Sequence, residues 1–339
     1  MTPPVVVLGA GSWGTALAIH LGRLGMAPRL WGRDHALLEE IDERRENARY
    51  LAGIRVPAGV RPTADPEEAL AGAGIVIVAV PSRFFETTLE GMKDRVPPGA
   101  VLVSASKGLE PRQGCRLSVV LSRLRPGQPV AVLSGPSFAR EVAAGRPTAL
   151  VVASADPSVA GALQRALAAP AFRLYTNHDV IGVEIAAALK NVMAIATGLA
   201  DGLDLGENAR AALVTRGLAE IVRLGVALGA ERGTFLGLAG LGDLVLTCTG
   251  SLSRNRALGR DIARGRALDD VERGMRMVAE GVRTVPAALR LARDAGVSMP
   301  ICEEVGAVLF EDKPVPEALH ALLSREPRPE EEQEGRGGR

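Results

Sequence analysis

Cysteine and histidine are scarce in this 339-residue chain, and their spacing excludes two common kinds of site. The three cysteines, Cys115, Cys248 and Cys302, are odd in number and widely separated, so they predict no disulfide framework. No cluster of histidines and cysteines has the spacing of metal ligands. We therefore expect a protein of a reducing compartment that uses no metal.

Long uncharged apolar runs and an excess of charge of one sign are also missing. No stretch of about 18 apolar residues avoids charged side chains, which argues against a membrane span. The segment MTPPVVVLGAG lacks the cationic region of a signal peptide, so we expect a cytoplasmic protein. The formal net charge of +1 indicates neither a nucleic acid nor a membrane surface as partner.

Lysine is the rarer basic residue by far. It occurs only at Lys93, Lys107, Lys190 and Lys313, whereas Lys and Arg together number 40. A general bias toward arginine explains this ratio. Each remaining lysine is still a position where the available substitute was not used, and this makes Lys107 and Lys190 candidates for chemistry.

Short β-branched runs alternate with helical patterns in the first half of the chain. The predicted strands cover residues 5–8, 28–32, 75–80, 101–106, 130–135 and 149–154. Their hydrophobicity is nearly continuous, as expected for strands that are buried on both faces. Helical periodicity appears between them, for example at 15–25 and 35–45. The alternation predicts an α/β fold with a Rossmann-type, doubly wound parallel sheet.

The apolar spacing becomes helical near residue 180 and stays so to about residue 310, as in 183–200 and 209–229. No convincing strand is predicted there. We expect a dinucleotide-binding Rossmann domain at 1–180, an all-α substrate-binding domain at 181–324 and a disordered tail at 325–339. The tail is charged and contains proline and glycine.

The stretch GAGSWGTALA, at residues 9–18, places the pattern GxGxxG directly between a predicted strand and a predicted helix. This is the context that dinucleotide binding requires. Gly9 permits the tight turn, Gly11 lets the backbone approach a pyrophosphate, and Gly14 lets the helix pack closely on the strand. The helix N-terminus then offers free N–H groups to anionic oxygens. The alternative is a tight turn that binds no ligand.

Four side chains near this loop bear on the cofactor. Ser12 adds a hydroxyl, and Trp13 either covers the pyrophosphate or packs on the second domain. The second predicted strand ends in LWGRD, where Arg33 suits the 2′-phosphate of NADP and Asp34 suits the ribose hydroxyl of NAD. We favour NADPH, with NADH also used.

Further segments occur in an order that one enzyme family shares. They are NARYLAG (47–53), VAVPS (78–82), SASKGLE (104–110), LSGPSFA (133–139), AALKNVMAIATGLADGL (187–203), ARAALVTRGLAEI (209–221), GLGDLVLTCTGSLSRN (240–255) and AEG (279–281). With the glycine loop, they resemble the bacterial type of NAD(P)-dependent glycerol-3-phosphate dehydrogenase from about residue 5 to about 310. One departure is Ala52, because the family commonly has YLPG where this chain has YLAG.

This resemblance implies reversible hydride transfer between NAD(P)H and dihydroxyacetone phosphate, giving sn-glycerol 3-phosphate for phospholipid synthesis. It also implies a cytoplasmic enzyme, often a homodimer. Two rival interpretations remain: a two-domain reductase of the hydroxyacid or ketopantoate type, and a cofactor-sensing regulator without turnover. The first of these would need side chains that bind a substrate carboxylate, and it explains the SRN segment less readily.

Reduction of a ketone requires a proton donor and stabilisation of the new alkoxide. The resemblance makes Lys190 the proton donor, with Asp243 in the active site beside it and Lys107 bonded to substrate near the nicotinamide. From the residues alone, Lys190 is an ammonium in an apolar helix that desolvation would make less basic, or a lysine that snorkels to the surface. Asp243 is otherwise a helix cap, and Lys107 an ordinary loop lysine. Asn191 is a weaker candidate for orienting substrate.

The remaining site residues come from the same resemblance. A hydroxyl, a guanidinium and an amide at a predicted helix start suit a phosphate, although a serine cap followed by a surface arginine has the same pattern. The implied substrate contacts are Gly135, Ser137, Ser253, Arg254 and Asn255, and the implied cofactor contacts include Tyr50, Lys107, Ala139, Arg254, Val278 and Glu280. Without the resemblance, the GPS segment is only a turn and Glu280 only a surface acid.

Overall fold

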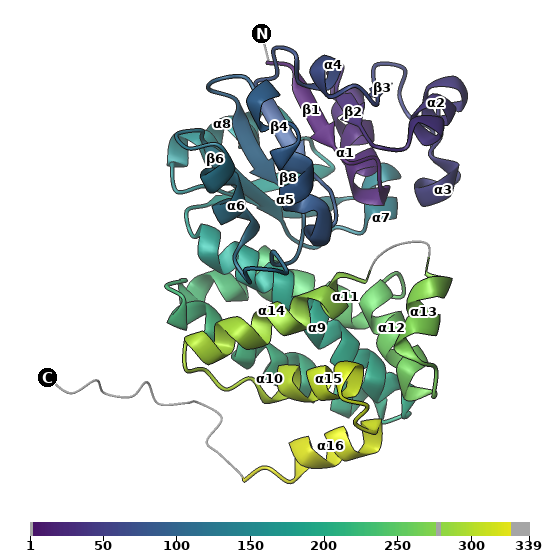
Figure 1. Ribbon diagram of the computed structural model, residues 1–339, viewed down its shortest axis with the longest axis vertical. Helices are drawn as coiled ribbons and strands as arrows, with labels where there is room; N and C mark the ends of the chain where they lie inside the picture. Colours follow the sequence, from purple (N-terminus) through teal and green to yellow (C-terminus); the bar gives the residue numbers. More distant parts are fainter. Residues whose placement is uncertain (1–2, 276–278, 327–339) are drawn as a thin grey trace, which may run out of the picture.

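The computed structural model describes residues 3–275 and 279–326. A sheet with helices on both faces lies in one half of the molecule, and a group of helices lies in the other (Figure 1). The last strand ends at Asn177 and the long helix α9 begins at Val180. The predicted tail, 325–339, lies almost entirely outside the described residues.

Eight strands form one sheet in the order β3-β2-β1-β4-β5-β6-β7-β8. The strands are β1 (Val5–Leu8), β2 (Arg29–Trp31), β3 (Arg61–Thr63), β4 (Ile75–Val78), β5 (Val101–Ser104), β6 (Val130–Ser134), β7 (Thr148–Ala153) and β8 (Phe172–Asn177). Each of the six predicted strands is present, and the α/β class with a Rossmann-type sheet is confirmed.

Two strands were missed and one pairing was wrong. β3 is a three-residue edge strand that contains Pro62, and proline is tolerated in a sheet only where its missing N–H is not needed. β8 lies at the other edge, where buried and exposed residues alternate in place of a continuous apolar run. β6 and β7 pair antiparallel, so the sheet is mostly rather than wholly parallel.

Both faces of the central strands are buried, which explains their continuous hydrophobicity. Val5 and Val7 face a core that α1, α2, α7 and α8 cover, whereas Val6 and Leu8 face a second core under α4, α5 and α6. The helices of this half are α1 (Ser12–Arg23), α2 (His35–Arg44), α3 (Ala48–Leu51), α4 (Pro66–Leu70), α5 (Ser82–Glu90), η1 (Lys93–Arg95), α6 (Leu117–Leu124), α7 (Ala139–Ala143) and α8 (Pro157–Leu167).

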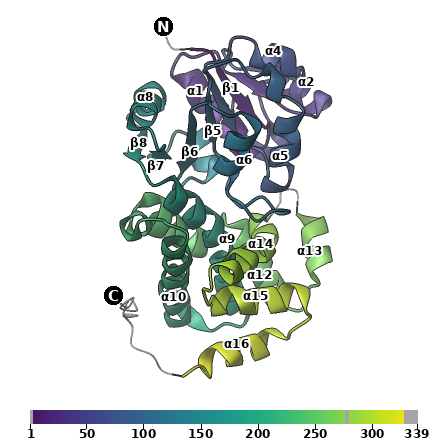
Figure 2. The same cartoon turned by 60° about the vertical axis from the view of Figure 1, so that its left-hand side comes forward.

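Helix α9 forms the centre of the other half (Figures 1 and 2). It contacts α10, α11, α12 and α14, and Gly182–Ala200 are all buried. The helices of this half are α9 (Val180–Gly202), α10 (Gly206–Ala227), η2 (Arg232–Leu236), the π-helical turn η3 (Leu238–Gly242), α11 (Asp243–Thr249), α12 (Arg254–Ala263), α13 (Leu268–Gly274), α14 (Glu280–Asp294), α15 (Pro300–Phe310) and α16 (Val315–Leu323). No strand occurs among the described residues of this half.

By length and composition α9 resembles a membrane-spanning helix. Most of its apolar window, 89%, is buried inside the protein. Helix α9 is therefore surrounded by other helices of the protein, as a core helix is.

Candidate active site

A pocket of about 570 Å³ lies between the two halves. The loops that follow β1, β2, β4 and β5 line one side, and residues of α9, α11, α12 and α14 line the other. β1 is hydrogen-bonded to both β2 and β4, so the chain reverses direction across the sheet at this point. Ligands of open α/β sheets bind at such a switch point, beyond the carboxyl ends of the strands.

The glycine loop has the geometry of a dinucleotide cradle. Gly9 has φ of 119°, and a Cβ there would lie 2.6 Å from the Ala79 carbonyl oxygen. A Cβ on Gly14 would lie 1.8 Å from the Gly9 carbonyl oxygen, so helix and strand approach too closely for any side chain. Gly11 faces open space in the pocket. The residues present therefore fit a diphosphate against the start of α1.

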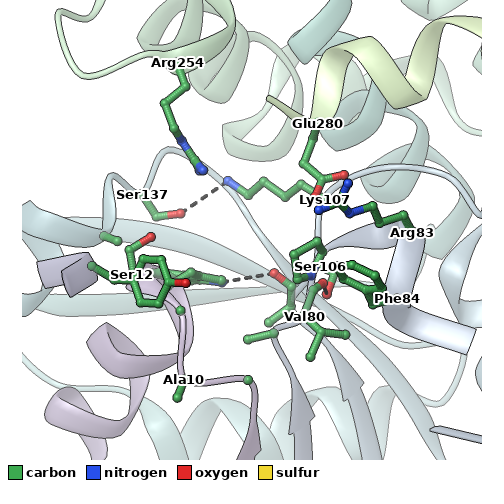
Figure 3. A pocket seen from close by; sticks show the side chains of 18 of the residues that line it. Ala10, Ser12, Val80, Arg83, Phe84, Ser106, Lys107, Ser137, Arg254 and Glu280 are labelled. Carbon is green, nitrogen blue, oxygen red and sulfur yellow. Dashed lines mark hydrogen bonds between the residues drawn. The ribbon is translucent and has the colours of Figure 1, made fainter. Parts of the chain in front are cut away.

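Trp13 lines the pocket and is held by its own half of the molecule. Its indole Nε1 donates a 3.0 Å hydrogen bond to the carbonyl oxygen of Ala105, which follows β5. The ring also packs against the core beneath α1. These contacts of Trp13 lie within the sheet half, and its cover over the pyrophosphate stays a prediction. Its neighbour Ser12 lines the same pocket as the first residue of α1 (Figure 3).

The end of β2 carries the two residues that bear on cofactor choice. Asp34 caps α2 by accepting from the Leu37 backbone N–H, and its other oxygen binds Arg49 at 2.8 Å. The Arg33 guanidinium instead lies over the ring of Phe84, 4.6 Å from its centroid. Tyr50 also lines the pocket.

Lys190, Asp243 and Lys107 form one charged group across the two halves. Lys190 Nζ donates to Asp243 Oδ1 at 2.5 Å, and Lys107 Nζ donates to Asp243 Oδ2 at 2.8 Å. Lys190 Nζ also donates to Thr247 Oγ1 at 2.8 Å. Lys190 is 5% exposed and Asp243 1%, and both lysines line the pocket. Asp243 itself lies behind the pocket wall, and the cap position of α11 is Gly242.

Burial changes the acidity of Lys190. The pKa of Lys190 is lowered to about 7, because loss of hydration and the positive charge of Lys107 together outweigh the opposing effect of Asp243. An amine with this pKa exchanges protons readily near neutral pH. The surface-snorkelling interpretation of Lys190 is therefore wrong.

The GPS segment after β6 lies beside Lys107. Lys107 Nζ donates to the Gly135 carbonyl oxygen at 2.8 Å and to Ser137 Oγ at 3.3 Å (Figure 3). Gly135 has φ of 135°, which favours glycine, and it lies outside the lining of the pocket. Ser137 and Ala139 line the pocket.

The SRN segment forms the opposite wall. Ser253 caps α12 through the Arg256 backbone N–H and still lines the pocket. Asn255 is held by two bonds of 2.9 Å, since its Nδ2 donates to Asn191 Oδ1 and its Oδ1 accepts from the Gly281 N–H. Arg254 points from the helical half toward Lys107 (Figure 3). A hydroxyl, a guanidinium and amides thus converge near the ammonium groups.

Glu280 joins the two halves at a second place. Its carboxylate accepts from Ser82 Oγ at 2.5 Å and from the Ser82 backbone N–H at 3.3 Å. Desolvation raises the pKa of Glu280, against these hydrogen bonds and the charges of Arg254 and Arg83. Val278 lies outside the described residues.

Sequence reasoning missed Thr247, Arg83 and Phe84, which also line the pocket. Thr247 follows Asp243 by four residues on one helix, so this spacing was a signal that both side chains share a face. Arg83 and Phe84 begin α5 after the VAVPS segment and had no comparable signal. No group of three potential metal ligands occurs among the described residues.

Comparisons with known proteins agree with this geometry. Models of the N-terminal and C-terminal parts of NAD-dependent glycerol-3-phosphate dehydrogenase match residues 4–160 and 179–320. A glycerol-3-phosphate dehydrogenase [NAD(P)+] of Geobacter sulfurreducens is 50% identical, covering 96% of this chain and 98% of that protein. A crystal structure of glycerol-3-phosphate dehydrogenase from Coxiella burnetii has 39% identity and a TM-score of 0.93, covering 96% of this chain and 99% of that one.

A ketopantoate reductase of Ralstonia eutropha represents the rival reductase. It covers 94% of this chain and 100% of its own, with a TM-score of 0.62 at 19% identity, so it shares the fold alone. The sequence and structural matches together show that the chain belongs to the NAD-dependent glycerol-3-phosphate dehydrogenase family.

Proposed function

We propose that this chain reversibly reduces dihydroxyacetone phosphate to sn-glycerol 3-phosphate with NADPH or NADH, for glycerophospholipid synthesis. The observation that carries the proposal is the group of Lys190, Asp243 and Lys107 in the pocket that the glycine loop also lines. The names of relatives about 50% identical support the same activity.

The chain's own residues supply the proton and the positioning. A reduced nicotinamide, when bound, supplies hydride to the ketone carbon. Lys190 donates a proton to the resulting alkoxide, and in the oxidation direction its neutral amine accepts that proton. Asp243 fixes the ammonium, because a charge buried this deeply is stable only when paired. Lys107 places a second positive charge beside the oxygen as negative charge develops there.

The phosphate end of the substrate is assigned to the SRN segment. Ser253 and Asn255 provide a hydroxyl and an amide at the start of α12, where the helix also favours an anion. Arg254 provides charge-assisted hydrogen bonds. We assign Gly135 and Ser137 to the other end of the substrate, next to Lys107.

The cofactor is assigned to the opposite part of the pocket. Gly9, Gly11 and Gly14 shape the diphosphate cradle, with Ser12 and Trp13 beside it. The remaining assigned contacts are Arg33, Tyr50, Lys107, Ala139, Arg254 and Glu280. We assign the cofactor preference to NADPH because Asp34, the acid that suits NADH, is already engaged by Leu37 and Arg49.

One assay tests the activity. NADPH oxidation is followed with dihydroxyacetone phosphate, ketopantoate and a β-keto acid under the same conditions. We expect turnover with dihydroxyacetone phosphate alone. Comparable turnover with ketopantoate would transfer the proposal to the rival reductase, and NADPH binding without any turnover would indicate the regulator.

A cytoplasmic location and a homodimer complete the proposal. Sedimentation equilibrium of the purified chain distinguishes a dimer from a 35.4 kDa monomer. Fractionation of cells that produce the full chain, followed by activity measurement in each fraction, tests the location.

A further inference from the structure

Three arginines surround the end of the pocket that β2 and β4 form. Arg33, Arg49 and Arg83 line it together with Asp34 and Phe84. Asp34 binds Arg49 through one oxygen and caps α2 through the other. Asp34 is therefore already paired with Arg49. Neither Arg33 nor Arg83 forms an ion pair with a described carboxylate.

Arg33 and Arg83 share a single aromatic platform. The Arg33 guanidinium carbon lies 4.6 Å from the centroid of the Phe84 ring, and that of Arg83 lies 4.5 Å from the same centroid. Figure 3 shows Arg83 and Phe84 side by side at one edge of the pocket. A cation over a ring face is attracted by the π electrons, and this holds each guanidinium in place.

Stacking of this kind leaves the hydrogen-bonding edges of both arginines available. The N–H donors of a guanidinium lie in its plane, whereas the ring contacts only its face. Two positive charges that share one ring repel each other, and an anion with several oxygens relieves the repulsion. The third arginine, Arg49, is neutralised by Asp34 and adds no such unmet charge.

We propose that Arg83 and Arg33, both stacked on Phe84, form the site that recognises the 2′-phosphate of NADPH. Arg83 and Phe84 thereby become determinants of cofactor selectivity in addition to Arg33. The proposal rests on the proposed function only for the identity of the cofactor. A 2′-phosphate carries up to two negative charges, which match two guanidinium groups, whereas the ribose hydroxyl of NADH offers no charge to either.

The competing role for Arg83 is electrostatic support of Glu280. The positive charge of Arg83 opposes the rise in the pKa of that carboxyl group. A residue that acts only through Glu280 and its bonds to Ser82 does not distinguish a 2′-phosphate from a hydroxyl, so it affects NADH and NADPH equally. The two roles therefore predict different results.

Measurements of ligand binding distinguish the two roles of Arg83 without any need for turnover. The probes are 2′,5′-ADP and 5′-AMP, which differ only in the 2′-phosphate, and their Kd values are measured by isothermal titration calorimetry. In Arg83→Ala we expect the Kd of 2′,5′-ADP to rise about 10-fold or more, as the loss of one charge-assisted hydrogen bond predicts, with the Kd of 5′-AMP nearly unchanged. The NADPH-to-NADH ratio of kcat/KM should fall by the same factor.

Two further variants locate the effect. Phe84→Leu keeps an apolar side chain but removes the ring face, so the selectivity should fall by about two- to fivefold. Arg44→Ala removes an exposed arginine of α2 that is outside the pocket, and it should leave both Kd values at their original levels.

Equal losses for the two probes in Arg83→Ala, or no loss for either, would overturn the proposal. Both of these outcomes are Kd measurements, so they can be distinguished from a failure of the proposed function. That failure would appear as absence of dihydroxyacetone phosphate-dependent NADPH oxidation in the unsubstituted protein.

Discussion

Asp243 is a single carboxylate that two ammonium groups share, and it is almost completely buried. Burial of an unpaired charge is costly, so the carboxylate both retains Lys190 inside the protein and directs its Nζ into the pocket. The positive charge of Lys107 acts in the opposite sense and lowers the pKa of Lys190. The balance leaves an amine that changes protonation near neutral pH.

This balance predicts opposite pH profiles for the two directions of reaction. Reduction needs the protonated amine, so kcat/KM for dihydroxyacetone phosphate should fall about tenfold per unit above pH of about 7. Oxidation needs the neutral amine, so kcat/KM for glycerol 3-phosphate should rise up to that pH. Rates measured from pH 5.5 to 9.5 test this, and parallel profiles in both directions would contradict it.

Removal of the amine should abolish most of the chemistry. In Lys190→Ala we expect kcat to fall about 10²–10⁴-fold, the range for loss of a general acid, with NADPH binding retained. Lys93→Ala is the matched control, because Lys93 is a surface lysine that pairs with Glu90. Equal activity of the two variants would exclude Lys190 as the proton donor.

At the scale of elements, several helices take their caps from neighbours. Pro300 begins α15, which has no capping side chain of its own. The Glu220 carboxylate of α10 accepts from the Ile301 N–H at 2.8 Å and from the Cys302 N–H at 3.4 Å. Burial raises the pKa of Glu220 to about 7, despite these two hydrogen bonds. The cap therefore couples the stability of α15 to pH.

The sign of this coupling follows from proton uptake. Between its ordinary pKa of 4.5 and about 7, Glu220 holds a proton in the folded state and releases it on unfolding. Its contribution to stability thus falls as pH rises through this window. The Tm of the unsubstituted protein should decline more from pH 5 to pH 7 than that of Glu220→Gln. Identical declines, measured by differential scanning calorimetry, would contradict the coupling.

At the scale of the whole molecule, three buried or half-buried polar contacts join the halves among the described residues, and the exposed Arg290 side chain adds a fourth by donating to the Arg112 carbonyl oxygen at 2.5 Å. Two are Lys107 with Asp243 and Ser82 with Glu280, which lie at the pocket. The third is buried away from it, where Glu184 of α9 accepts from the Ser118 backbone N–H at 2.8 Å and pairs with Arg116 at 3.0 Å. Glu184 thereby caps α6 from the opposite half and fixes the orientation of the helix that carries Lys190.

Loss of this third contact should uncouple the halves. In Glu184→Ala we expect the free energy of unfolding to fall by about 3–5 kcal/mol, since Arg116 is left without this partner. Both tryptophans, Trp13 and Trp31, belong to the sheet half, so their fluorescence reports it, whereas far-UV circular dichroism reports chiefly the helices.

Urea unfolding followed by both signals is the measurement. The two transitions should coincide in the unsubstituted protein and separate in Glu184→Ala. Arg44→Ala breaks only an exposed pair, in which Arg44 is 72% exposed, and should change little. Coincident transitions in Glu184→Ala would show that the other contacts alone couple the halves.

Local patterns in the sequence were sufficient for six of the eight strands of the sheet and for the glycine turn between β1 and α1. Continuous β-branched runs mark strands buried on both faces, and the glycine spacing follows from contacts within one turn, such as Gly14 against Gly9. The same patterns failed for β3 and β8, because edge strands lack that burial. Resemblance to a family, rather than spacing, supplied the candidate roles of Lys190 and Asp243.

Only the tertiary structure decided which distant groups meet. Lys190 and Asp243 are separated by 53 positions in the sequence, and no pattern in that stretch specifies their contact, which arises because α9 packs against α11. The stack of Arg33 and Arg83 on Phe84 likewise depends on the pairing of β1 with both β2 and β4. Local periodicity encodes burial and backbone conformation, whereas pKa values and ligand contacts depend on neighbours that only the folded chain brings together.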